Sequence, residues 1–440
     1  MSPPTCTAER PGDVSRRLPP VPSSVPEARR LVRDLLAAVG RDDLEETATL
    51  LVSEVVTNAL LHAGTPILVA ARLEGRLLRV EVGDGSLHLP VPRRYASTAG
   101  TGRGLRMLEQ LVDDWGVERH SDGKTVWFTL SDGERGMQGH GTFAGVVATG
   151  EDPSPGADVV EVELLSVPLL LHAAWQEHVE ALLRELLLAS LDEEDLEDFD
   201  SIAMHAEATN ALAVLAEHVP AVDLDLEPDR LMSDVTEPRI TSPRVVVPVP
   251  RESVANFDTL ERAVLAALDL STNGGTLTPP TQPELQQFRS WLCRQVRRQA
   301  SGHTAEPWIV DDSTPAPARR TPSWDPASVL GAATGRVAAD EANRIIAVSR
   351  SAASLLGYAD PWYLVGLRLL AMIPERYHQA HVAGFTLMQL TGRGPLLGNA
   401  VEVPARRADG SEVLVSLLVR VERGEDGRPV FVAEIEPAEA

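Results

Sequence analysis

Apolar residues between positions 24 and 63 recur with the spacing of amphipathic helices. Ser23, Ser24 and Pro26 stand at the start of the first run and are typical of a helix N-terminus. A second helical run begins near Asp42. The i, i+3, i+4 pattern turns one face of each helix toward a core. The apolar positions are Ala28, Leu31, Val32, Leu35, Leu36 and Val39 in the first run, and Leu44, Ala48, Leu51, Val52, Val55 and Ala59 in the second.

Short β-type runs follow the two helices. Residues 67–73 and 77–82 are joined at Glu74-Gly75, and residues 116–120 and 124–130 are joined at a turn ending in Gly123. Between the two pairs, a glycine-rich segment precedes a further helical pattern with Leu105, Leu108, Leu111 and Val112. Helices and strands in this order predict a two-layer α/β sandwich over residues 21–131.

Three polar features of this segment suggest chemistry. Glu54 and Asn58 are four residues apart, so they lie one turn from each other on the flank of the second helix's apolar stripe. Asp84 ends a strand and is followed by Gly85. Gly100, Gly102 and Gly104 precede a helix N-terminus, where bare backbone amides suit a phosphate chain. Each feature alone fits an ordinary helix flank, turn or loop equally well.

Taken in order, the blocks SEVVTNALLHA, VEVGDGS, GTGRGL and GKTVWF resemble the GHKL ATPase superfamily. Within that superfamily they are most similar to the anti-sigma-factor serine/threonine-protein kinases. The resemblance covers about residues 20–131. It departs from the family at Ser86, where the adenine block usually has a glycine.

The resemblance implies a role for each matched residue. Asn58 would ligate Mg²⁺ on the triphosphate of ATP, and Glu54 would be the general base for a protein serine or threonine hydroxyl. Asp84, with Gly85 beside it, would accept a hydrogen bond from the adenine amino group. Thr125 would contact adenine through water. The lid over the phosphates would be formed by Gly100, Thr101, Gly102 and Gly104.

Histidine kinases share this ATPase fold, but they place a phosphoacceptor helix before it. Here a tail, expected to be disordered, precedes the segment. His172 and His178 follow it without the acidic neighbour of an acceptor histidine, and His62 at the end of the Glu54 helix reads as a packed or capping residue. A histidine kinase is therefore not favoured.

The whole chain is predicted to be an α+β multidomain protein. We expect a disordered tail at 1–20, linkers at 132–157 and 311–327, and a mostly helical connector at 158–310 that includes a long helix over 162–191. No internal repeat is evident. The acidic block 192–200 lacks the spacing of a calcium loop, so no metal is assigned there.

Residues 328–437 have the pattern of two strands, several short helices and a three-stranded meander with Asp-Gly turns. The runs AASLLGYADPWYLVGL and RRADGSEV resemble a PAS domain, which implies ligand sensing or dimerisation. The segment has no cysteine for flavin-thiol photochemistry. His381 stands near the place of the iron ligand in haem-binding PAS domains, but a packed helix histidine is the favoured interpretation, and the ligand stays unassigned.

Charge and composition limit the classes of binding partner to be expected. The formal net charge of −24 argues against nucleic acid as a direct partner and fits protein partners. No apolar run is long enough for a membrane span, and the N-terminus has no signal-peptide pattern. Cys6 and Cys293 are too far apart in sequence to suggest a disulfide framework. A cytoplasmic location is expected.

These observations predict a PAS-modulated serine/threonine-protein kinase of the anti-sigma type. Its expected partners are an anti-anti-sigma-like substrate and a sigma factor, with a homodimer through the PAS or helical region left open. The alternative is an ATP-binding scaffold that exchanges partners without phosphorylating them. Intact Glu54 and Asn58 favour the kinase, whereas Ser86 leaves the scaffold open.

Overall fold

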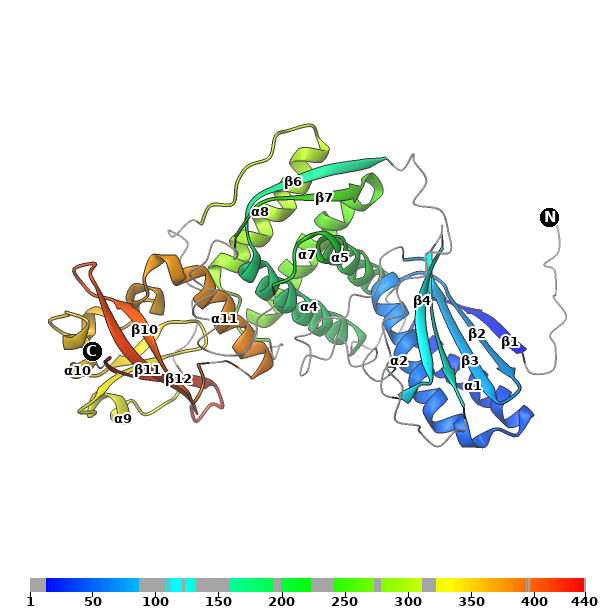
Figure 1. Ribbon diagram of the computed structural model, residues 1–440, viewed down its shortest axis with the longest axis horizontal. Helices are drawn as coiled ribbons and strands as arrows, with labels where there is room; N and C mark the ends of the chain where they lie inside the picture. The colour runs from blue at the N-terminus through cyan, green and yellow to red at the C-terminus, as the bar shows by residue number, and fades with distance from the viewer. Residues whose placement is uncertain are drawn as a thin grey trace. The chain divides into compact units, whose positions relative to one another are not determined.

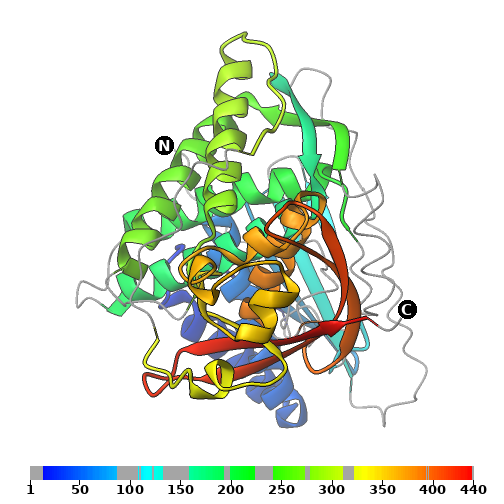
Figure 2. The same cartoon turned by 90° about the vertical axis from the view of Figure 1, so that its left-hand side faces the viewer.

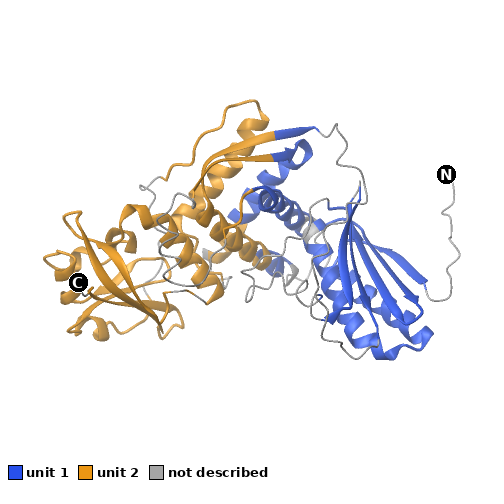
Figure 3. Ribbon diagram, viewed as in Figure 1, with its two compact units in different colours: residues 1–160, 186–218, 248–265 blue, residues 161–185, 219–247, 266–440 orange. Residues whose placement is uncertain are grey.

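The computed structural model divides the chain into two compact units (Figure 3). The first unit contains residues 1–160, 186–218 and 248–265, and the second contains residues 161–185, 219–247 and 266–440. The structure describes residues 13–86, 108, 111–120, 123–131, 158–192, 199–222, 241–272, 278–310, 322–392, 394 and 396–438.

A five-stranded antiparallel sheet with the order β1-β2-β3-β5-β4 forms one layer of the first unit (Figure 1). Its strands are β1 Asp13–Leu18, β2 Ile67–Glu74, β3 Leu77–Asp84, β4 Asp114–His120 and β5 Gly123–Leu130. Alternate residues of β3 are buried, so Leu78, Val80 and Val82 face the core while Arg79 and Glu81 face the other side. The pattern expected for β2 to β5 is confirmed.

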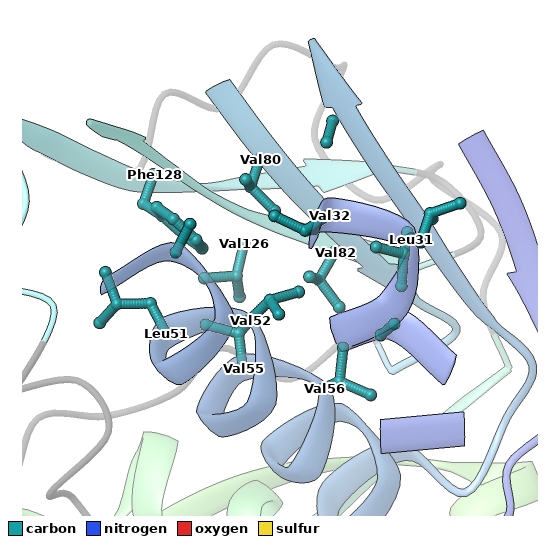
Figure 4. Packing of buried hydrophobic residues seen from close by; sticks show 14 of the residues in the cluster. Leu31, Val32, Leu51, Val52, Val55, Val56, Val80, Val82, Val126 and Phe128 are labelled. Carbon is teal, nitrogen blue, oxygen red and sulfur yellow. The ribbon is translucent and has the colours of Figure 1, made fainter. Parts of the chain in front are cut away.

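Helices α1 Ser24–Val39 and α2 Glu45–Ala63 form the second layer, joined by the 3₁₀ turn η1 Asp42–Leu44. Val52, Val55 and Val56 of α2 meet the core side chains of β3 and β5 (Figure 4). Each buried valine of this kind stabilises the fold by roughly 1.5 kcal/mol or more relative to exposure. The predicted two-layer sandwich is confirmed, and its core fixes α2 across the sheet.

The prediction of a disordered tail over residues 1–20 is wrong for Asp13–Leu18, which form strand β1. Asp13–Leu18 pairs antiparallel with β2, from Asp13 opposite Arg72 to Leu18 opposite Ile67. Leu18 is 2% exposed and belongs to the core. The polar segment DVSRRL gives little hydrophobic signal by itself, because an edge strand buries few of its residues and takes its hydrogen bonds from a neighbour.

The connector contains strands as well as helices. Its elements are β6 Val159–Pro168, α4 Leu169–Asp192, α5 Phe199–His218, β7 Thr241–Pro250, η3 Arg251–Ser253, α7 Val254–Thr272 and α8 Pro283–Ala300. The long helix expected over 162–191 begins only at Leu169, because residues 162–168 belong to β6, which pairs with β7. A continuous apolar run does not distinguish strand from helix. Pro168 disfavours a helical conformation at the preceding residue, Val167, and so marks the boundary between β6 and α4.

Each of the two strands of the connector is followed by a helix, with the short η3 between β7 and α7. Strands β6 and β7 have the same length, and both of their bounds are 82 residues apart. At the same offset a Val-Pro pair ends each strand, at 167–168 and at 249–250. Buried residues at this offset are Trp175 and Phe257, and Leu182 and Val264.

The C-terminal segment folds around a second five-stranded antiparallel sheet of order β10-β11-β12-β8-β9. Strands β10 to β12 are orange to red in Figure 2. The strands are β8 Gly335–Ala339, β9 Ile345–Val348, β10 Ala400–Arg406, β11 Glu412–Arg423 and β12 Pro429–Pro437. Between them lie α10 Arg350–Leu355, η4 Pro361–Tyr363, η5 Leu369–Met372, η6 Glu375–Tyr377 and α11 His378–Thr391, and α9 Ala327–Leu330 precedes β8. The expected two strands, short helices and three-stranded meander are confirmed.

None of the helices in the described ranges combines the length and apolar character that crossing a membrane requires.

Aromatic rings and a neutral histidine fill the connector's interior in the second unit. Trp175 and Phe288 pack edge to face with centroids 5.6 Å apart, and Phe288 also contacts Trp308 at 5.3 Å. His178 is completely buried, and its Nε2 lies 2.7 Å from Thr281 Oγ1. Burial lowers the pKa of His178 to about 4.

We expect His178 to make the chain sensitive to mild acid. Because its folded-state pKa lies below the ordinary value of 6.5, protons bind the unfolded chain more tightly. The stability present above pH 6.5 should therefore fall as the pH drops toward 4, by about 1.4 kcal/mol per pH unit and roughly 3 kcal/mol in total. Urea unfolding followed by tryptophan fluorescence at pH 7, 5.5 and 4.5 measures this loss. His178→Leu should lose less stability over the same range, and equal losses in the two proteins would contradict the assignment.

Candidate functional site

Two half-buried polar side chains interrupt the apolar surface of α2. Glu54 and Asn58 lie one helical turn apart, between the buried positions Leu51, Val55 and Ala59. Neither side chain makes a hydrogen bond or ion pair with any other residue in the described ranges. Both side chains are half-buried and so remain open to solvent or to a ligand. A carboxylate and a carboxamide in this position can bind a ligand.

Asp84 stands at the end of β3 on the helix-covered face of the sheet. It follows Val80 and Val82 at two-residue spacing, so the alternation of the strand turns all three side chains toward the layer that contains α2. Its residue exposure is 8%. Asp84 Oδ1 accepts hydrogen bonds from the Ser86 backbone amide at 2.8 Å and from Lys124 Nζ at 3.1 Å.

The electrostatics of Asp84 and Lys124 are coupled. Burial raises the pKa of Asp84, and the positive charge of Lys124 offsets part of that change. Burial lowers the pKa of Lys124, and the Asp84 carboxylate opposes that change. The charged form of each group is therefore stabilised by the charge of the other.

The end of α2 and the end of β3 are held together by short contacts. The Gly85 backbone amide donates to Thr65 Oγ1 at 2.8 Å, two residues beyond the helix. A Cβ atom on Gly85 would lie 3.1 Å from that hydroxyl, and a Cβ on Gly123 would collide with the Asp84 carbonyl oxygen. The glycines thus permit a close approach that fixes Asp84 relative to the last turn of α2.

Thr125 does not share the face of Asp84. Along β5, Lys124, Val126 and Phe128 point to the helix-covered side, whereas Thr125 pairs with Gly83 on the opposite side. Thr125 Oγ1 lies 3.0 Å from His120 Nε2. The water-mediated adenine contact expected of Thr125 stays a prediction, and the residue of β5 that lies opposite Asp84 is Lys124. Side chains alternate between the two faces of a strand, so counting outward from the apolar Val126 would have indicated that Lys124 lies on the helix-covered face.

The expected lid lies outside the described residues. Nothing is therefore said of the structure of Gly100, Thr101, Gly102 and Gly104. Leu108, four residues later, has helical conformation, is 1% exposed and belongs to the core that contains α2. Leu108 is thus part of this domain.

Helix α5 completes the first unit although it lies about 70 residues beyond β5 in the sequence. It packs against α2, and Ile202 joins the core cluster of the sandwich. Gly64, with φ +59°, ends α2 so close to α5 that a Cβ there would lie 2.5 Å from Ala206 Cβ. The Ser86 hydroxyl donates to the Asn210 side-chain oxygen in a long bond of 3.5 Å, next to Asp84. The sequence pattern predicted mostly helical structure over residues 158–310, but no motif indicated that a helix of this segment packs on α2.

His381 in the PAS-like domain has a partner within the protein. Its Nε2 lies 3.1 Å from Asn343 Oδ1, to which it donates, and its ring stacks on Phe385 with centroids 5.8 Å apart. Burial lowers its pKa to about 3, with the charges of Arg368 and His378 acting in the same direction. The ring is therefore neutral and oriented by Asn343. This agrees with the packed-histidine interpretation.

Among the described residues, no three His, Cys, Asp or Glu side chains gather as a protein-only metal site would require. A metal held chiefly by a bound phosphate chain needs only one or two protein ligands. The Asn58 carboxamide offers one such oxygen.

Comparison with known families assigns the first domain. Residues 18–130 match the histidine kinase-like ATPase domain family. These residues therefore form a histidine kinase-like ATPase domain, a type of domain that implies ATP binding. None of the curated proteins compared with this chain matches it.

Solved structures similar to this chain include PAS domains. The PAS domain of an HTR-like protein from Haloarcula marismortui is 19% identical over 26% of this chain and 87% of that one, with a TM-score of 0.21. A PAS domain of a protein from Colwellia psychrerythraea is 12% identical over 25% of this chain and 91% of that one, with a TM-score of 0.22. An RNA-binding light-oxygen-voltage receptor is 11% identical over 87% of this chain and 80% of that one, with a TM-score of 0.20. These TM-scores carry no inference about what the chain does.

The buried Asp84–Lys124 pair gives a stability prediction. Lys124→Met leaves a buried carboxylate without its counter-charge and should lower the free energy of unfolding by about 3–5 kcal/mol at pH 7. The double variant Asp84→Asn, Lys124→Met removes both charges and should lose less than Lys124→Met alone, because a buried pair replaced by neutral groups is often tolerated.

Urea denaturation of the wild type, both single variants and the double variant gives the coupling energy between the two side chains. A non-zero coupling that favours the pair is expected. Losses that simply add up would show that the two residues do not interact energetically.

Proposed function

We propose that the chain is an Mg²⁺-ATP-dependent serine/threonine-protein kinase of the anti-sigma type, modulated by its PAS-like domain. The observation that carries the proposal is the half-buried pair of Glu54 and Asn58, unpartnered in the described part of the chain and one turn apart on α2. The histidine kinase-like ATPase domain over residues 18–130 supports ATP as the nucleotide.

Asp84 is proposed to select the base. It lies on the same face of the sheet as α2, and its Oδ2 accepts no hydrogen bond from any residue in the described ranges. A carboxylate oxygen is an acceptor only, so it suits the amino group of adenine rather than the carbonyl oxygen of guanine. Gly85 lets the backbone pass close to Thr65 next to this carboxylate.

Asn58 is proposed to hold the metal and Glu54 to accept a proton. A carboxamide oxygen is a suitable hard ligand, and Mg²⁺ when bound would neutralise charge on the phosphates. Glu54 would take the proton from a serine or threonine hydroxyl of the partner protein as that oxygen attacks the γ-phosphate. Gly100, Thr101, Gly102 and Gly104 are proposed to cover the phosphates.

An anti-anti-sigma-like protein is the proposed substrate and a sigma factor the proposed second partner. The net charge of −24 favours protein partners over nucleic acid. Residues 328–437 would sense a ligand or dimerise, and residues 158–310 would link that event to the kinase in the cytoplasm. The PAS ligand is not assigned, and the engaged His381 does not favour haem.

A second candidate is an ATP-binding scaffold without phosphoryl transfer. One observation at the adenine end leaves room for it: Ser86 stands where the resembled family usually has a glycine. This difference acts on nucleotide affinity rather than on the reacting phosphate. Transfer to a partner protein therefore distinguishes the two candidates.

Glu54→Gln should abolish transfer and leave ATP binding intact. Removal of a general base slows proton transfer by roughly 10²- to 10⁴-fold, whereas the side-chain volume is kept. The measurement is incorporation of γ-labelled phosphate from Mg²⁺-ATP into candidate anti-anti-sigma proteins of the same proteome. Glu46→Gln, on an exposed turn of the same helix, is the matched control and should transfer at the wild-type rate. Wild-type binding of ATP with no transfer to any partner would support the scaffold, and unimpaired transfer by Glu54→Gln would exclude Glu54 as the base.

Asn58→Ala should remove the Mg²⁺-dependent part of the ATP affinity. A polar contact to a charged group contributes roughly 1.5–3 kcal/mol, so the affinity should fall about 10- to 100-fold. Calorimetry with Mg²⁺ and again with excess EDTA separates this part from binding of the base. The two proteins should bind alike in EDTA. An unchanged affinity for Mg²⁺-ATP in Asn58→Ala would overturn the metal assignment.

A further inference from the structure

A buried lysine faces the carboxylate that the proposed function assigns to adenine. Lys124 lies opposite Asp84 in the pairing of β3 with β5, and its Nζ is 3.1 Å from Asp84 Oδ1. The side chains of Lys124 and Asp84 are 7% and 2% exposed. Lysine is almost never buried to this degree unless it is paired, as Lys124 is here with Asp84.

Among the described residues, the hydrogen bonds donated to Asp84 reach one of its two oxygens. Oδ1 accepts from both Ser86 N and Lys124 Nζ, so these two donors fix the plane of the carboxylate. No residue in the described parts of the chain donates to Oδ2. The arrangement holds the group from one side and leaves an acceptor on the other.

Packing alone does not explain the pair. A buried ion pair recovers its desolvation cost poorly, and well-packed apolar residues of similar volume are often at least as stable. The neighbouring core positions Val82 and Val126 show that the same face of these strands is otherwise apolar. A charged pair at this one place, at the end of the strands, fits a task in recognition better than a task in stability.

We infer that Lys124 is a positioning residue for base recognition, which holds Asp84 ionised and oriented so that Oδ2 can accept the 6-amino hydrogen of adenine. The inference rests on the proposed binding of ATP at this site. Lys124 supplies the charge that keeps the buried carboxylate in its accepting form, where burial alone would favour the neutral acid.

Other charged groups surround the pair on neighbouring elements. Arg119 of β4 disfavours the charge of Lys124, and Glu217 of α5 lies 3.4 Å from Arg119. His120, also on β4, contacts Thr125 on the other face of the sheet. The wild type and the Lys124 variants share these charged groups. The pH dependence of ATP affinity in each variant is therefore compared with that of the wild type.

Purine riboside triphosphate, which lacks the 6-amino group, tests the inference. Wild-type protein should prefer ATP to this analogue at pH 7, since one hydrogen bond to a charged acceptor is at stake. In Lys124→Met the affinity for ATP should fall about tenfold or more, while the affinity for the analogue should change less than about threefold. The preference for ATP should therefore largely disappear.

The pH profile gives a readout that a purely structural role would not move. In Lys124→Met the carboxyl group has lost its counter-charge, so ATP affinity should rise with pH as Asp84 ionises. The wild type should vary less between pH 6 and 8. Arg79→Met, on the opposite face of β3, is the matched control and should keep the wild-type preference and profile.

Lys124→Gln provides a second variant if Lys124→Met does not fold. It keeps a hydrogen-bond donor to Asp84 without the charge, and the same loss of preference and the same pH profile are expected. Equal losses for ATP and the analogue, or no loss for either, would overturn the inference. Failure of the wild type to bind both nucleotides would instead overturn the proposed function, and the inference with it.

Discussion

The apolar stripe of α2 against the sheet is the constraint on which the candidate site depends. Valines of the helix fill the space above β3 and β5, so the helix cannot rotate without exposing them. The same packing holds Glu54 and Asn58 at the border of the stripe, half-buried and unpaired in the described ranges. Close contacts between Thr65, Gly85 and Gly123 then fix the strand end that carries Asp84. The polar groups are thus positioned by apolar contacts that take no part in the chemistry.

Local pattern predicted much of the fold. The helices over residues 24–63, strands β2 to β5 and the strands of the PAS-like sheet follow from hydrophobic period and turn residues, because each element buries one face. The pattern did not reveal β1 or the strand character of β6. An edge strand carries few apolar positions, and a continuous apolar run has no period to separate strand from helix.

The sequence predicted which residues belong to the candidate site but not how these residues are arranged in space. Glu54, Asn58 and Asp84 could be named because their spacing and order resemble a family, although their roles remain proposals. Thr125 was chosen from the same block, yet the alternation of β5 turns Lys124 toward Asp84 instead. The contact of Asn210 with Ser86 joins positions that no local pattern relates, because it depends on how α5 packs against α2.

The share of α5 in the ATPase interior has a consequence for how such a chain can evolve. The recognisable family segment ends at residue 130, but Ile202 and Ala206 cover the surface at the end of α2. A recombination event that transferred only the recognisable segment to another gene would leave this surface open to solvent. The interior of the domain therefore extends beyond the segment that matches the family.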